Sequence, residues 1–232
     1  MKKILTIILI IALIAVTGCQ VKEENTINVE GNSEITVDPD EAEVWAGFSV
    51  VKLTAEDAQN EANKVINAMI NGLKAAGIPE NDMETEQLSL YEERRWEEGK
   101  STVVGWRASQ TLKIKTTDLT KVGQIVDIAV NNGANQINNI NFGLSEEKEQ
   151  EYKRQALAEA TKNAKEKAEV VADSLGVKLG KIKSASTAEY YFRPYAVPMA
   201  EMAVGKAVEE AAQVLPGDVT VTARISIIYN IG

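Results

Sequence analysis

The stretch EAEVWAGFSVVKLTAEDAQNEANKVINAMINGLKAAGIP, Glu41 to Pro79, changes its apolar repeat from every second residue to helical spacing. Alternate residues between Ala42 and Val50 are apolar, which predicts a half-buried strand. Thr54 with Asp57 three residues later has the spacing of a helix N-cap, and the closing Gly-Ile-Pro predicts the end of that helix. The apolar side of the helix is predicted to comprise Ala58, Ala62, Val65, Met69, Leu73 and Ala76.

A hairpin is expected after this helix. Residues 85–96 and 102–115 alternate around the tip EEGK, which predicts two antiparallel strands. Asp118 is placed to cap a second helix, which Asn131-Asn132-Gly133 ends.

A final strand closes this block of sequence. In GANQINNINFGL, residues 133–144, the apolar phase slips, so a β-bulge is expected near Asn138-Asn139. From about Thr36 to Leu144 the predicted order is β-α-β-β-α-β, the split order of ferredoxin-like folds. Such a unit has an antiparallel sheet with both helices on one face.

The flanking segments extend this core. An alternating strand is expected from Thr26, with a bulge at Gly31-Asn32. A long helix over 146–175 carries alanine at every fourth position, which permits close approach to a neighbour. Two further strands are expected near 181–192 and after Pro216-Gly217, with an irregular stretch between them that ends at Leu215. The predicted fold class is therefore α+β.

The N-terminus has the pattern of a secretion signal. Lys2 and Lys3 precede the apolar run Ile4–Val16, which is shorter than the roughly 20 residues of a membrane-spanning helix. Val-Thr-Gly precedes Cys19, the only cysteine in the chain, and resembles a bacterial lipobox. Lipidation of Cys19 would hold the protein on a membrane through two acyl chains, whereas the alternative is an ordinary signal peptide beside an incidental cysteine.

These segments give a domain plan: a signal peptide over 1–18, a lipidated cysteine with a tether over 19–25, and one domain over 26–232. Residues 36–144 and the remainder are possible sub-domains. Cleavage removes two of 25 basic residues and none of 34 acidic ones, so 23 basic residues remain and the mature formal charge is −11. This charge argues against a nucleic-acid partner, because phosphate binding needs clustered cations.

The composition also narrows the possible chemistry. The chain has no histidine, which excludes a Ser-His-Asp triad, a Cys-His pair and imidazole metal ligands. An acylated Cys19 would leave no free thiol. The paired acids Glu92, Glu93, Glu97 and Glu98 flank the hairpin tip and are the one candidate for carboxylate-dependent hydrolysis. Ordinary surface ion pairing explains them as well, so no catalytic, cofactor-binding or metal-binding residue is assigned.

An interaction surface is a more concrete expectation. Residues 190–215, YYFRPYAVPMAEMAVGKAVEEAAQVL, concentrate aromatic, proline and methionine residues where a connector is usually polar. This suits an assembly contact or a ligand lip, and a loop folded over the core is the alternative. Trp96 is out of phase with the apolar face of its strand, whereas Trp106 is in phase with the core. The candidate interface residues are Trp96, Tyr190, Tyr191, Phe192, Tyr195, Met199 and Met202.

The ordered set of these segments resembles the SIMPL-domain family. The resemblance rests on INVEGNSEITVDPDEAEVWAGFSV, KAAGIPENDMETEQLSL, VGWRASQTLKIK, GANQINNINFGLSE, the alanine-rich helix and LPGDVTVTARISIIYNI, and it covers about Ile27 to Ile231. It implies an envelope protein with an α+β fold and a tendency to form ring-like or channel-like homo-oligomers. Some relatives are described as oxidative-stress-defence or periplasmic immunogenic proteins. The resemblance brings no catalytic site, and the lipobox distinguishes this chain from soluble periplasmic relatives.

Three functions remain open from the sequence. The first is a non-enzymatic, lipid-anchored envelope protein that self-assembles through exposed strand edges or residues 190–215. The second is a binding protein for a small ligand or an envelope partner, using the same segment and Trp96. The third is a carboxylate-dependent hydrolase.

Overall fold

The computed structural model describes residues 25–97, 99–196 and 214–232. The predicted signal peptide, Cys19, Glu98, Met199 and Met202 lie outside the described residues, as does the side chain of Tyr190. The described chain forms two compact units. The five-stranded unit comprises residues 33–97, 99–158, 189–196 and 214–223, and the three-stranded unit comprises 25–32, 159–188 and 224–232.

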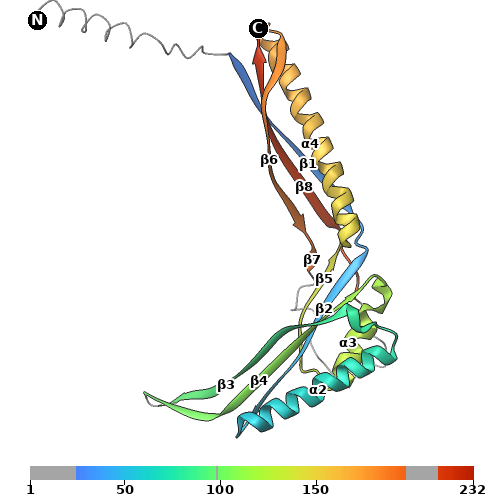
Figure 1. Ribbon diagram of the computed structural model, residues 1–232, viewed down its shortest axis with the longest axis vertical. Coiled ribbons are helices and arrows are strands. Elements are labelled where there is room, and N and C mark those ends of the chain that lie inside the picture. The colour runs from blue at the N-terminus through green and yellow to red at the C-terminus, as the bar shows by residue number, and fades with distance from the viewer. Residues whose placement is uncertain (1–24, 98, 197–213) are drawn as a thin grey trace, which may run out of the picture. The chain divides into compact units, whose positions relative to one another are not determined.

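The described helices and strands are labelled in Figure 1. Three α-helices and two 3₁₀ turns alternate with eight strands in this part of the chain. In chain order the elements are β1 (Thr26–Val37), β2 (Glu41–Lys52), α2 (Ala55–Ala75), η1 (Glu80–Asp82), β3 (Met83–Glu97), β4 (Lys100–Thr116), η2 (Leu119–Lys121), α3 (Val122–Asn131), β5 (Gln136–Gly143), α4 (Glu146–Leu175), β6 (Leu179–Arg193), β7 (Tyr195–Ala196) and β8 (Val219–Ile231).

The predicted β-α-β-β-α-β core is confirmed in the five-stranded unit. Its sheet has the order β3-β4-β2-β5-β7, in which β2 lies between β4 and β5 and is antiparallel to both. The first four strands have the order expected of a split βαβ fold. The predicted bulge is also present, because the register between β2 and β5 shifts between Trp45, opposite Asn139, and Ala46, opposite Ile137.

The core of this unit lies between the sheet and helices α2 and α3. Thr54 caps α2 as predicted, since its Oγ1 accepts from the amide of Asp57 at 3.1 Å. Gly77 follows the helix with φ of 83°, a conformation that favours glycine. The predicted apolar side was partly wrong: Ile66 is buried, whereas Val65 is only partly buried. The residues that α2 buries are Ala58, Ala62, Ile66, Met69 and Leu73.

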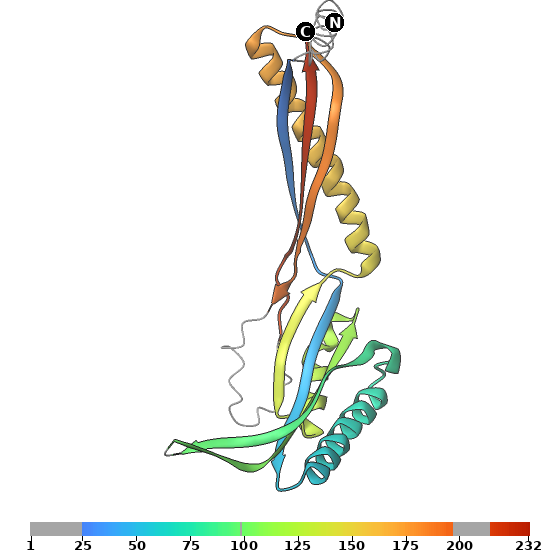
Figure 2. The same ribbon diagram turned by 60° about the vertical axis from the view of Figure 1, so that its left-hand side comes forward.

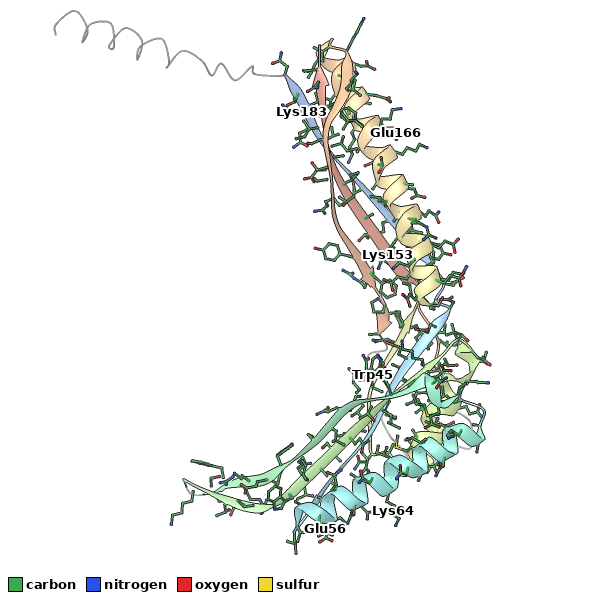
Figure 3. All side chains as sticks on the ribbon, in the orientation of Figure 1. Trp45, Glu56, Lys64, Lys153, Glu166 and Lys183 are labelled. Atoms are coloured by element: carbon green, nitrogen blue, oxygen red, sulfur yellow. The ribbon has the colours of Figure 1, made fainter. Side chains whose placement is uncertain are left out.

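In the three-stranded unit, α4 runs along one face of the sheet β1-β8-β6 (Figure 2). The predicted alanine ridge is confirmed: Ala160, Ala164 and Ala168 are fully buried. The other faces of α4 carry charged side chains, such as Glu166, which is labelled in Figure 3. No helix among the described residues combines the length and the apolar character needed to cross a bilayer.

Gly31 of β1 explains how closely α4 approaches this sheet. A Cβ atom added at Gly31 would lie 2.0 Å from the carbonyl oxygen of Ala160 and 2.7 Å from the Cβ of Ala164. Neither atom can move without displacing α4. The absence of a side chain at Gly31 and the small side chains of the alanine ridge together allow α4 to pack closely against β1.

The region after β5 differs in detail from the prediction. The strand expected near 181–192 is β6 and continues to Arg193. Two residues that were expected to be irregular, Tyr195 and Ala196, form β7 and pair with Phe142 and Asn141 of β5. Residues 197–213 lie outside the described part of the chain.

Candidate interaction surface

The hairpin β3–β4 continues beyond the strand that supports it. β2 pairs with β4 only as far as Lys52, opposite Trp106. Residues 93–97 and 100–105 therefore pair with each other alone and form a two-stranded arm that projects past the helices of this unit (Figure 1). Trp96, opposite Ser101 near the end of the arm, is 72% exposed.

Charged contacts hold the base of the arm. Arg107 Nε donates to Glu93 Oε2 at 2.7 Å, and Arg107 also donates to Ser49 Oγ of β2 at 3.3 Å. These bonds link β2, β4 and β3 across one face of the sheet. The hydrogen bond from Arg107 lowers the pKa of Glu93 below its ordinary value of 4.5.

The pKa of Glu93 provides a direct test of this link. In Arg107→Met, we expect the pKa of Glu93 to return to the ordinary glutamate range, measured by carboxyl-carbon NMR titration. A carboxyl with a lowered folded pKa contributes stability that is present above its unfolded pKa and lost as the pH falls through its folded pKa. The arm should therefore loosen in the wild type as the pH falls below the ordinary glutamate range and through the lowered pKa of Glu93. A Glu93 pKa that does not respond to Arg107→Met would show that the contact is absent in solution.

Among the residues that the structure describes, no strand pairs with the outer edge of β3, because β3 stands at the end of the sheet order. Leu88 and Leu90 are 62% and 41% exposed. They lie opposite Gln110 and Ala108, and Ala108 packs against α2. The two leucines thus face the side of the sheet that α2 covers, but they remain exposed there.

The middle of this edge lacks common features that prevent strand addition. Register shifts occur between Thr85 and Gln87 and between Glu93 and Arg94, whereas residues 87–93 pair regularly with β4. Residues 87–91, QLSLY, carry no charge. Bulges and charges protect sheet edges from association, so this stretch of β3 is the open part of the edge. Leu88 and Leu90 were not among the predicted interface residues, although two leucines that alternate within an otherwise polar strand indicate an exposed apolar stripe.

The predicted acidic residues of the hairpin form surface ion pairs. Arg94 donates to Glu92 at 2.6 Å, and Arg95 lies 3.7 Å from Glu97. With the contact between Arg107 and Glu93, each of the three predicted hairpin glutamates that the structure describes is paired with an arginine. Within the described residues, no three His, Cys, Asp or Glu side chains form a group suited to a metal ion.

The predicted interface residues are not gathered in one place. Trp96 lies on the arm at the end of β3, whereas Tyr195 belongs to β7 at the opposite edge of the same sheet. The Tyr195 ring lies 6.5 Å from the ring of Phe142, with the two planes tilted by 39°. Phe192 is partly buried and Tyr191 is exposed. Trp106 packs against the buried alanines of α2 and β4, as expected from its phase.

A small acidic hollow lies beside β5 and the start of α4. Its volume is about 230 Å³, and burial raises the pKa of Glu41 within it. The neighbouring Asp40 accepts from the amide and the hydroxyl of Ser145 at 2.7 and 2.8 Å, which orders the residue before α4. The hollow is lined by Glu41, Glu43, Lys115, Asn141, Gly143, Leu144, Glu146, Glu149, Phe192 and Pro194.

Comparisons with known proteins give one consistent result. The sequence profile of the SIMPL family, described as "Protein of unknown function (DUF541)", matches residues 27–229. The chain is 25% identical over 214 residues to the 26 kDa periplasmic immunogenic protein of Brucella melitensis, covering 88% of this chain and 84% of that protein. It is 26% identical over 187 residues to the uncharacterized protein YggE of Escherichia coli K12, covering 81% of this chain and 74% of that protein.

Proposed function

The chain belongs to the SIMPL family, and we propose that it is a non-enzymatic, lipid-anchored envelope protein that assembles with copies of itself. The name of the Brucella relative places that protein in the periplasm, which supports an extracytoplasmic location here. The signal-like N-terminus and Cys19 support secretion followed by lipid anchoring. The family resemblance supports a proposed role in envelope or oxidative stress protection.

The open edge of β3 is the observation that carries the assembly proposal. No described strand pairs with the outer edge of the uncharged stretch 87–91, and Leu88 and Leu90 expose apolar surface there. A second copy that adds a strand here would satisfy the backbone groups and cover the leucines in one step. The mature formal charge of −11 keeps unassembled copies soluble.

The charged groups on the hairpin support a non-enzymatic role. Glu92, Glu93 and Glu97 are paired with arginines on an exposed hairpin. A glycosidase needs two carboxyl groups with separate environments on either side of a sugar. Carboxylates in surface ion pairs along one strand lack that arrangement.

Anchoring is tested at Cys19. In Cys19→Ser, we expect the protein to move almost entirely from the membrane fraction to the soluble fraction, because the acyl chains supply the membrane affinity. Fractionation of the source cells with immunodetection measures the change, and mass spectrometry of the wild-type N-terminus identifies the acyl groups. Cys19→Ser protein that stays membrane-bound, or an unacylated wild-type terminus, would contradict the anchor.

Self-assembly is tested on the soluble chain that begins at Gln20. Light scattering over a concentration series should give a mass that is a multiple of the single chain. A strictly monomeric mass at high concentration would contradict assembly.

A second candidate function is a binding protein for an envelope partner, and the exposed Trp96 favours it. An aromatic ring on a projecting arm is typical of binding hot spots. Crosslinking in intact membranes separates the two functions. Recovery of a second copy of this chain supports assembly, whereas recovery of a different envelope protein through Trp96 supports the binding protein.

A further inference from the structure

β1 is an edge strand of the three-stranded sheet, because β8 is the only described strand that pairs with it. An edge strand presents backbone N–H and C=O groups to any strand that approaches it. Beside β1 the surface is also apolar. A groove of about 430 Å³ runs between β1 and α4, and Val29, Val170 and Val171 supply its apolar lining. Without further protection, this edge would favour strand addition.

Two side chains of α4 form hydrogen bonds with backbone groups of β1 at this edge. Lys167 Nζ donates to the carbonyl oxygen of Glu30 at 2.9 Å. The Asn163 side-chain oxygen accepts from the backbone N–H of Asn32 at 3.3 Å. Lys167 Nζ also donates to the side-chain oxygen of Asn32 at 3.1 Å, which fixes the ammonium group between the two residues.

The carbonyl of Glu30 and the N–H of Asn32 are the two backbone groups with which a neighbouring strand would pair. In an extended strand, the carbonyl of one residue and the N–H two residues later point to the same side. One residue of a parallel neighbour would donate to the first group and accept from the second. Lys167 supplies the donor and Asn163 supplies the acceptor. We propose that these two side chains of α4 replace one residue of a neighbouring strand and thereby close the β1 edge to strand addition.

The close contact between β1 and α4 makes this replacement possible. Gly31 lies between Glu30 and Asn32, and its missing side chain lets the turn of α4 at Ala160 and Ala164 approach the strand. Asn163 and Lys167 are four residues apart, so they lie on the same side of the helix. Since the helix is held this close, both side chains reach the edge of β1. This inference concerns β1 alone and does not depend on assembly through β3.

The test removes the two side chains and measures the β1 edge. The chain beginning at Gln20 carries Leu88→Lys/Leu90→Lys, so that association through β3 does not obscure the result. In that background, Asn163→Ala/Lys167→Ala is expected to speed amide exchange at Asn32 about tenfold. It is also expected to tighten self-association about tenfold, measured by sedimentation velocity over a concentration series.

Matched variants separate edge protection from a change in charge or fold. Lys165→Ala removes the same charge from α4, where Lys165 lies 3.6 Å from Glu169, and should leave both readouts unchanged. Asn163→Asp/Lys167→Arg keeps one acceptor and one donor and should restore both readouts to the background values. If circular dichroism shows that the double alanine variant is unfolded, Lys167→Met alone is measured in the same way.

The outcomes are decisive. Faster exchange at Asn32 together with new association supports the proposal. Faster exchange without association overturns it, because the contacts would exist without protecting the edge. Unchanged exchange and unchanged association also overturn it. A wild-type chain that proves monomeric would count against assembly through β3 but would leave this comparison valid.

Discussion

Gly31→Ala is expected to lower the free energy of unfolding by about 3 kcal/mol, at the upper end of the usual cost of overpacking. The new Cβ would lie 2.0 Å from the carbonyl oxygen of Ala160, far inside van der Waals contact. That oxygen belongs to the backbone of α4, so relief requires the helix to move off the sheet. Such a movement would also open the contacts of the neighbouring alanine ridge. Chemical denaturation followed by circular dichroism measures the loss.

Gly143→Ala is the matched control for this prediction. A Cβ at Gly143 would meet only the ring of Phe192 at 3.5 Å, which is ordinary contact. Gly143 is also in a β-strand, so the intrinsic difference between glycine and alanine in an extended strand is shared by the two variants. Equal stability changes in the two variants would contradict the close packing of α4 against β1.

Leu88→Lys/Leu90→Lys is expected to convert the assembled protein to a monomer. Strand addition at the β3 edge would place a strand of a second copy, either its own β3 or another edge strand, beside Leu88 and Leu90. Lysines there would bury charge without partners, and edge lysines are a common protection against strand pairing. We expect the dissociation constant to rise at least about a hundredfold, measured by sedimentation velocity, with the unfolding midpoint nearly unchanged because both side chains are already exposed.

Leu53→Lys controls for the change of an exposed leucine to a cation. Leu53 is 87% exposed between β2 and α2, away from the β3 edge. It should leave assembly intact. If Leu53→Lys disrupts assembly as strongly as the β3 variant, net charge rather than the β3 edge controls association. If neither variant disrupts it, assembly uses another surface.

Much of the fold could be predicted because it is encoded locally. The switch of apolar period at Lys52–Thr54, the cap at Thr54 and the glycine at position 77 each act within a few residues, and all three occur where they were expected. The alanine ridge of α4 could also be predicted, because alanine at every fourth position of a helix indicates close packing against a neighbour. The bulge at Asn138 followed from a phase slip in one short segment.

Features that depend on contacts distant in sequence could not be predicted. The sequence around Gly31 predicts a bulge. Nothing near this glycine in the sequence indicates that α4 packs against it. Ile66 is more fully buried than Val65, although both pack against the same core. Periodicity alone leaves an uncertainty of one residue in that choice.

The candidate surface shows the same division. Exposure of Trp96 followed from its phase in the strand, but the open edge of β3 depends on the order of strands in the sheet. Tyr195 was expected to share a surface with Trp96, whereas sheet order places the two at opposite edges. The contacts of Asn163 and Lys167 with β1 span more than 130 residues of sequence.

The proposed function requires this protein to be a membrane-tethered assembly of identical chains. Intact-complex mass spectrometry of the wild-type protein, extracted from its membranes in mild detergent, tests that claim in one experiment. We predict a complex whose mass is a whole multiple of the mature chain, each copy starting at Cys19 and bearing acyl groups. Single chains with a bare thiol at that position would contradict both the anchor and the assembly.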